Sequence, residues 1–170
     1  RLLVDIDQHL RETMSGRYEF SIVGQGDESE YLQSKMKNAR YRGVLRGESL
    51  ARAYADFDAF VFPSETDTYG NVVLEALASG VPALVTGRGG PKFLIEHGVT
   101  GFVCNSAPEF AHFAGVLMQN PARHAAMRAD ARRSALKRKW ERIFESVYEA
   151  YACALAVGDV SEHVQTSAFL

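Results

Sequence analysis

The sequence has little cysteine, no long apolar run and no strong excess of either charge. Two cysteines occur in 170 residues, Cys104 and Cys153, and their spacing matches neither a metal site nor a disulfide framework. This usage fits a cytoplasmic protein, which is the location we expect. No stretch has the pattern of a signal peptide or the length needed to cross a bilayer.

The charges are nearly balanced, with 19 Lys and Arg against 21 Asp and Glu and a net charge of −2. General attraction to nucleic acid or to a membrane surface is therefore not expected. The five histidines form no spaced cluster, so we expect no metal. Neither a Ser-His-Asp order nor a nucleophile elbow appears. The apolar share of 46% is ordinary for a globular domain of this size.

Apolar residues alternate along the chain between strand-like and helix-like spacing. Strands are expected at 18–23, 40–45, 59–62, 82–86 and 100–104. Helices are expected at 2–14, 28–38, 47–57, 70–79 and 92–97, and again from 110 onward. This alternation predicts an α/β fold, a Rossmann-like doubly wound parallel sheet with helices on both faces. We expect the domain to span residues 1–157 and a tail without a clear pattern to occupy 158–170.

The last third of the chain carries a basic run and then an aromatic stripe. The run at 132–142 is most simply a solvated helix face. The stripe is most simply packed in the core, and it comprises Trp140, Phe144, Val147, Tyr148 and Tyr151.

A glycine turn follows the first expected strand, with Asp27 as the expected N-cap of the next helix. Gly24 and Gly26 suggest a dinucleotide-binding turn, but Ser29 holds the place of the third glycine. Val44 stands where an acid would be required. A tight strand-to-helix turn is the simpler interpretation.

The chain is organised around the segment 60–80, which reads as a strand end, a polar loop and a short apolar helix. Glu75 is the only charge between Asn71 and Gly87. Because an unpaired carboxylate among apolar residues is costly, we expect it to have a donor. That donor could be a backbone N–H, an arginine or the hydroxyl of a bound ligand.

A second carboxylate, Asp67, lies in the loop that leads into this helix. Between the two acids, the helix start offers free N–H groups at Gly70, Asn71 and Val72, which together with the helix dipole attract phosphate. A phosphate-binding site between two carboxylates that can accept from hydroxyls suits a nucleotide sugar, which has a diphosphate in the middle and hydroxyl groups at both ends.

The carboxylates are embedded in PSETDTYGNVVLEALASGVPALVT, and GGPKFLIEHGVTGFV follows. The spacing Asp67-x7-Glu75 resembles the motif of family 4 (group 1) glycosyltransferases, and the likeness extends over residues 18–151. The resemblance implies a GT-B enzyme, of which this chain is the C-terminal, donor-binding half. The first strand of that half and the N-terminal acceptor domain would then precede Arg1.

The resemblance also implies roles for individual residues in a retaining transfer of sugar from a nucleotide diphosphate. Glu75 would hold the ribose, and Asp67, which replaces the commoner glutamate, would hold the donor sugar. Backbone groups of Tyr69, Gly70, Asn71 and Val72 would bind the diphosphate without a metal or other cofactor. Gly24 would lie beside the phosphates and Val44 beside the nucleobase.

Parallel-sheet topology gives an independent argument for one site. Gly24, Val44, the 64–69 loop and Gly89-Gly90 all follow strands, and ligands of such sheets bind at the carboxyl ends of the strands. Lys92 could contact a phosphate or remain solvated.

Other functions stay open at this point. A non-catalytic GT-B-like module used for assembly would keep Asp67 and Glu75 as a structural pair. A GT-B epimerase would use the same sheet edge. The expected partners are a nucleotide-sugar donor and the acceptor domain but no nucleic acid, and the full-length enzyme could be peripheral to a membrane.

Overall fold

The structure is a computed structural model, and it describes residues 1–14, 17–138, 144–145 and 147–155. The chain divides into two compact units, residues 1–134 and 135–170. Within the described residues, none of the helices combines the length and apolar character that crossing a bilayer requires.

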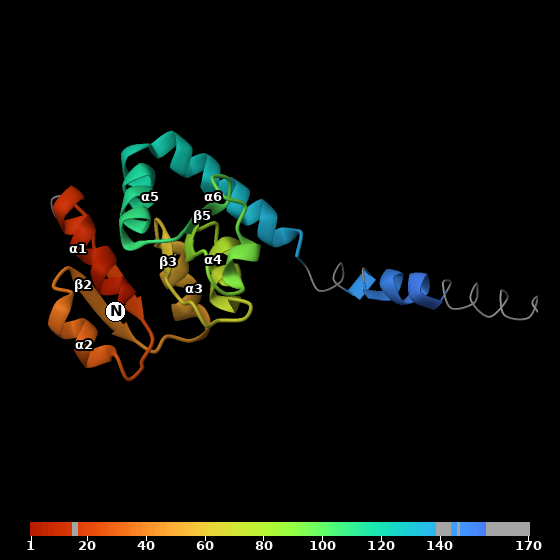
Figure 1. Cartoon of the computed structure of the whole chain (residues 1–170), viewed down its shortest axis with the longest axis horizontal. Coiled ribbons are helices and arrows are strands. Elements are labelled where there is room, and N and C mark those ends of the chain that lie inside the picture. The colour runs from red at the N-terminus through yellow and green to blue at the C-terminus, as the bar shows by residue number, and fades with distance from the viewer. Residues whose placement is uncertain (15–16, 139–143, 146, 156–170) are drawn as a thin grey trace, which may run out of the picture. The chain divides into compact units, whose positions relative to one another are not determined.

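Strands and helices alternate through the first unit, as the spacing of apolar residues predicts (Figure 1). The elements are α1 (Leu2–Met14), β1 (Phe20–Val23), α2 (Ser29–Lys35), β2 (Ala39–Gly43), α3 (Gly47–Ala55), β3 (Phe60–Phe62), α4 (Asn71–Ala78), β4 (Ala83–Thr86), the 3₁₀ turn η1 (Pro91–Leu94), β5 (Gly101–Cys104), α5 (Ala107–Gln119) and α6 (Pro121–Leu136).

The strands pair in parallel, but they form two sheets where the sequence suggested one. β1 pairs with β2, and β4 lies between β3 and β5. Among the described residues, β1 and β3 share no ladder, so each keeps an open edge. Apolar patterning identifies strands but not which neighbours they pair with, which is why it could not predict this division.

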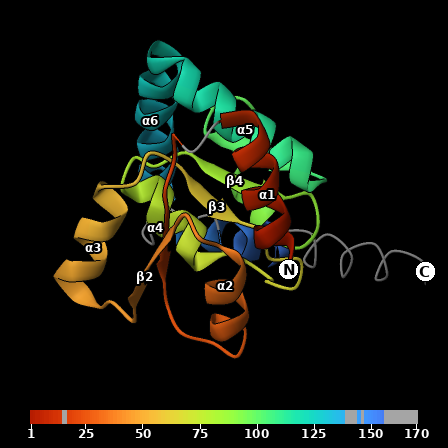
Figure 2. The ribbon, with the colours of Figure 1, turned by 90° about the vertical axis from the view of Figure 1, so that its left-hand side faces the viewer.

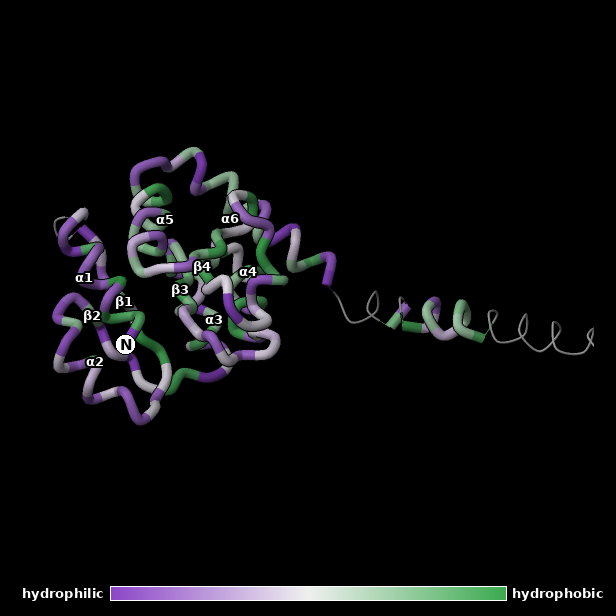
Figure 3. Tube along the Cα trace, in the orientation of Figure 1, coloured by the Kyte–Doolittle hydropathy of each residue, from purple (hydrophilic) through white to green (hydrophobic). Residues whose placement is uncertain are grey.

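Helices cover both faces of the three-stranded sheet, as expected for a doubly wound fold. Successive strand residues point to opposite faces. Phe60 packs with α3 and α4 side chains, whereas its neighbour Val61 packs with the cluster built from α1 and α5. Figure 2 shows α1 beside α5, and the apolar strands lie inside the fold in Figure 3.

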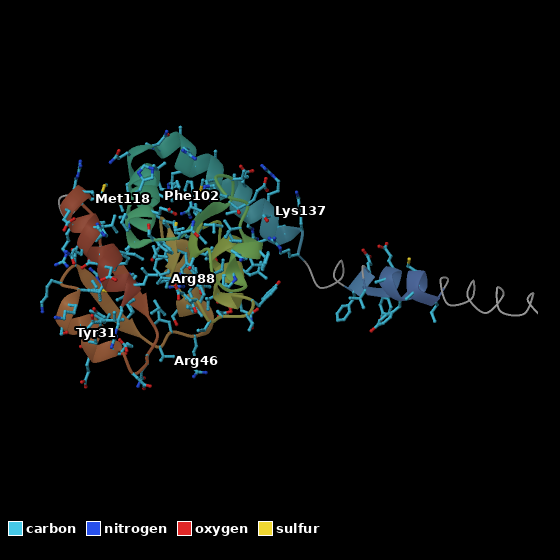
Figure 4. All side chains as sticks on the ribbon, in the orientation of Figure 1. Tyr31, Arg46, Arg88, Phe102, Met118 and Lys137 are labelled. Atoms are coloured by element: carbon cyan, nitrogen blue, oxygen red, sulfur yellow. The ribbon has the colours of Figure 1, made fainter. Side chains whose placement is uncertain are left out.

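The larger cluster buries apolar side chains from both ends of the first unit. Ile6 and Leu10 of α1 meet Leu84 of β4, Phe102 of β5 and Phe110 of α5. Each of these side chains is at most 2% exposed. Figure 4 shows Phe102 among the interior side chains, with Tyr31 and Arg46 at the periphery.

Some local expectations are wrong. Asp27 does not cap α2; the Ser29 hydroxyl donates instead to the Gly26 carbonyl at 2.6 Å. The expected helix at 92–97 is only the 3₁₀ turn η1, because Ile95 already has an extended backbone. Pro121 occupies the first position of α6, where a helix has no use for the missing N–H.

Arg132, the first residue of the basic run, is exposed and also has a partner elsewhere in the fold. The guanidinium of Arg132 donates to the Ala78 carbonyl, at the C-terminus of α4. Arg128 donates to the Phe57 carbonyl, just beyond α3, at 2.7 Å. Cations are favourable at helix C-termini, where carbonyls are unpaired and the dipole is negative. Two arginines of α6 therefore hold the ends of α3 and α4.

The described part of the second unit continues the helical pattern. Residues 144–145 and 147–155 are helical, and the stripe expected in the core is exposed there: Tyr148 is 68% and Tyr151 65% exposed. A single helical stretch cannot bury its own apolar stripe, which needs a second element to pack against. Trp140 and the tail at 158–170 lie outside the described residues.

We predict that Gly101→Ala destabilises the fold by at least about 1–3 kcal/mol, the range typical of overpacking. A Cβ at this position would lie 2.0 Å from the Ala83 carbonyl oxygen on the adjacent strand. Gly26→Ala is the matched control, since its Cβ would meet nothing within 4 Å. Thermal unfolding of the two variants tests this, and equal melting temperatures would contradict it.

We also predict that the two thiols differ in reactivity. Cys104 is fully buried and Cys153 exposed. Burial, with a smaller effect of the Glu109 carboxylate, raises the pKa of the Cys104 thiol to about 12. At about pH 8, a disulfide reagent should label Cys153 quickly and Cys104 only through unfolding. Rapid labelling of both would contradict the burial.

The sign of the pH effect follows from that raised pKa. The folded state favours the protonated thiol. The contribution of this thiol to the free energy of unfolding is therefore complete below the ordinary thiol pKa of 9.0 and is lost as pH rises towards 12. The free energy of unfolding should therefore fall over this range, and less steeply in Cys104→Ala.

Candidate functional site

The loop between β3 and α4 is shaped by one aspartate. The Asp67 carboxylate accepts the Tyr69 amide proton, with 2.9 Å between Oδ1 and the nitrogen. This local turn is typical of Asp and Asn in loops. The Asp67 carbonyl accepts from the Gly90 amide at 2.9 Å, so the same residue also ties this loop to the one that follows β4.

Only glycine fits at that second contact. A Cβ on Gly90 would lie 1.8 Å from the Thr68 carbonyl oxygen. Gly70, which precedes α4, has φ of 89°, and its Cβ would meet the Pro91 ring at 3.0 Å. The glycines of the β3 and β4 loops thus allow a close backbone approach that sets the position of the α4 start.

The α4 start opens into a cavity of about 380 Å³. Its lining consists of one continuous segment, Thr66 to Val72. Within the described part of the chain, the amides of Gly70, Asn71 and Val72 donate to no other residue. Unpaired amides at a helix start attract anions. The Tyr69 amide is not among them, because Asp67 already occupies it.

Glu75 lies one turn further along α4. Asn71 and Glu75 are both exposed and, at a spacing of four residues, share a helix face. The carboxylate does not stand in the apolar surroundings that the sequence suggested. Its donor is the Tyr54 hydroxyl of α3, at 3.1 Å from Oε2, and neither a backbone N–H nor an arginine.

Sequence reasoning missed Tyr54, although a cue was present. A tyrosine on the buried face of a helix usually finds a partner for its hydroxyl. Tyr54 is 6% exposed. Burial, and then the nearby Glu75 carboxylate, raise the pKa of its hydroxyl, which stays protonated as a donor.

Two cations that follow β4, Arg88 and Lys92, have partners within the chain. Arg88, labelled in Figure 4, pairs with Glu65 at 3.2 Å. Glu65 is the other carboxylate of the site loop, and this ion pair gives it a partner within the chain. Lys92 donates to the Gly87 carbonyl at 3.2 Å, so its ammonium is not simply solvated.

The remaining candidates lie elsewhere. Gly24 and Gly43 line a separate cavity of about 210 Å³ at the ends of β1 and β2. Val44 follows β2 and is 53% exposed, and it lines neither cavity. Of the groups expected to converge, Asp67 to Val72 line one cavity with Gly90 bonded to their loop, Gly24 lines another cavity, and Val44 lines neither.

No group of three or more metal-ligating side chains is placed to hold a metal ion in the part of the chain that the structure describes.

The sequence matches the model of the family described as "Glycosyl transferases group 1" over residues 1–120. The chain belongs to this family. The resemblance of the sequence to group 1 glycosyltransferases is confirmed.

Curated relatives are similar over most of the chain. A GDP-mannose-dependent alpha-mannosyltransferase of Corynebacterium glutamicum is 36% identical over 148 residues, covering 85% of this chain and 36% of the relative. One of Mycobacterium tuberculosis is 38% identical over 141 residues, covering 81% and 36%. The chain thus spans about a third of the length of these relatives.

Solved structures show the same fold. The pneumococcal O-GlcNAc transferase GtfA, in complex with UDP and GlcNAc, aligns with a TM-score of 0.72 at 21% identity, over 91% of this chain and 32% of its own. WaaG, a glycosyltransferase involved in lipopolysaccharide biosynthesis, aligns with 0.69 at 19% identity, over 80% and 38%.

We predict that Gly90→Ala loosens the site loop. The added Cβ must displace the Thr68 carbonyl or break the Gly90–Asp67 hydrogen bond, so the Gly90 and Tyr69 amides should exchange hydrogen faster. Amide exchange followed by NMR measures this, with amides of β5 as the internal reference. Unchanged protection at both amides would contradict the close contact.

Proposed function

We propose that this chain is the donor-binding half of a retaining glycosyltransferase that uses a nucleotide diphosphate sugar. The observation that supports this most is the α4 start, where three unpaired amides face a cavity of about 380 Å³ and Glu75 lies one turn away on an exposed face. Anion and hydroxyl acceptor sites are thus spaced along one helix, as the phosphates and ribose of a nucleotide require.

The amides of Gly70, Asn71 and Val72 would bind the diphosphate. As the sugar departs, negative charge develops on the leaving phosphate, and preorganised amides and the helix dipole stabilise it. In this arrangement, stabilising the leaving phosphate would not require a divalent metal. The amide of Tyr69 is left out of this role because it is already bonded to Asp67.

The two acids would act on hydroxyls. Asp67 uses Oδ1 for the Tyr69 amide, and its other oxygen would accept from the donor sugar. Glu75 uses Oε2 for Tyr54, and Oε1 would accept from the ribose. Gly24 would contact the donor only if the nucleotide bridges the two cavities, and Val44 only if the nucleotide extends over the surface just beyond β2.

The rest of the reaction would take place in a longer protein. An N-terminal domain would bind the acceptor, and we place the enzyme in the cytoplasm, peripheral to the membrane if the acceptor is a lipid. The similarity to GDP-mannose-dependent relatives makes GDP the diphosphate that we expect to bind most tightly.

We predict that Glu75→Gln in the full-length protein weakens nucleoside diphosphate binding roughly 10- to 100-fold, since a hydrogen bond to a charged group contributes about 1.5–3 kcal/mol. Calorimetry with UDP, GDP and ADP measures this. Glu12→Gln, which neutralises an exposed acid on α1, is the matched control. Equal affinities of wild type and Glu75→Gln would remove the ribose role.

The role of Asp67 is tested by turnover. Asp67→Ala should lower turnover with a nucleotide sugar while leaving the affinity for free diphosphate less affected. Unchanged turnover would remove the sugar role.

A further inference from the structure

Tyr54 and Glu75 form a contact between a buried donor and an exposed acceptor. The Tyr54 hydroxyl lies 3.1 Å from Glu75 Oε2, while the ring is almost completely enclosed. Phe57 packs edge-on against this ring at 5.9 Å between centroids, and Phe60 lies tilted at 5.7 Å. Ala76, the residue next to Glu75, belongs to the same apolar cluster. The donor is therefore held rigidly while the acceptor faces solvent.

The two helices that carry this pair are also held at their ends. Arg128 and Arg132 of α6 donate to carbonyls at the C-termini of α3 and α4, respectively. Tyr54 is in the last turn of α3, and Glu75 is in the second half of α4. The separation between the phenol and the carboxylate is thus fixed by the fold and does not depend on a ligand.

A solvated glutamate has three side-chain torsions and loses this freedom when it binds a ligand hydroxyl. A neutral donor on one oxygen removes much of that cost in advance without neutralising the carboxylate. It also leaves Oε1 as the oxygen available to a ligand. Burial and the nearby carboxylate raise the pKa of Tyr54, so the hydroxyl donates throughout the physiological pH range.

We propose that Tyr54 is a positioning residue for donor binding, whose hydroxyl fixes the Glu75 carboxylate so that Oε1 is presented to the ribose hydroxyls of the nucleotide. This inference rests on the proposed function of Glu75. It assigns no contact between Tyr54 and the ligand itself.

The test uses Tyr54→Phe in the full-length protein, which removes the hydroxyl and keeps the ring. Calorimetry with whichever of UDP, GDP and ADP binds wild type most tightly should show affinity weakened about three- to tenfold, in keeping with one hydrogen bond of neutral strength. The 2′,3′-dideoxy form of the same diphosphate should bind wild type and variant equally, because it lacks the groups that Glu75 would hold.

Tyr18→Phe is the matched control. Tyr18 is half-buried, and its hydroxyl donates to the Asp7 carboxylate at 2.7 Å, next to the start of β1 and away from the strand ends that carry the site. This variant should lower the melting temperature and leave both affinities unchanged. It therefore separates the loss of a tyrosine hydroxyl that binds a carboxylate elsewhere in the fold from the loss of the positioning contact.

A double variant completes the experiment. On a Glu75→Gln background, Tyr54→Phe should reduce the affinity much less than it does on wild type. The reason is that both changes disrupt the same contact between the Tyr54 hydroxyl and the Glu75 carboxylate. Full additivity, or an equal loss for the ribo and dideoxy ligands, would overturn the proposal. If Glu75→Gln weakens ribonucleotide binding and Tyr54→Phe does not, the proposed function stands and the positioning role is wrong. If neither variant changes affinity, both are wrong.

Discussion

The candidate site depends on the backbone contact between the loops that follow β3 and β4. Gly90 donates to the Asp67 carbonyl, and no side chain fits between Gly90 and Thr68. Such an approach is open only to glycine, and it leaves the site loop little room to shift. The start of α4 is thereby fixed to the edge of the three-stranded sheet, so its amides are oriented by the framework and not by a flexible loop. Preorganisation of this kind is what makes backbone dipoles effective towards a charged group.

Asp67 and Glu75 are arranged alike, because one oxygen of each carboxylate accepts a hydrogen bond from another group of the chain. Asp67 binds the Tyr69 amide within its own loop, and Glu75 binds the Tyr54 hydroxyl from another helix. In both cases the donor is neutral, so the negative charge remains. The other oxygen of each carboxylate does not share its lone pairs with that donor. It is therefore the better placed of the two to accept from a ligand hydroxyl. Glu65, two residues from Asp67, has a cationic partner in Arg88 and is not arranged in this way.

Much of the fold could be predicted from the sequence, because it is encoded locally. The apolar runs of β3 to β5 and Pro121 at the start of α6 are short-range patterns. The site loop was also predictable, since Asp67, the α4 start and Glu75 are within nine residues of one another. Pairing is a long-range property, however, and nothing local indicated two sheets or the separation of Gly24 from the α4 cavity. Tyr54 was missed for the same reason, because 21 residues separate it from Glu75.

The basic residues of α6 make long-range contacts that their local sequence pattern does not predict. Taken alone, a run of arginines on a helix indicates a solvated face. In the fold, Arg128 and Arg132 meet the carbonyls at the ends of α3 and α4, where unpaired acceptors and the helix dipole favour a cation. These contacts orient the two helices that carry Tyr54 and Glu75. The geometry of the exposed Glu75 carboxylate, in the second half of α4, is therefore supported by buried packing along the side of the helix and by charge at its C-terminus. A helix of eight residues, too short to be stable alone, can present a fixed binding face only through such support.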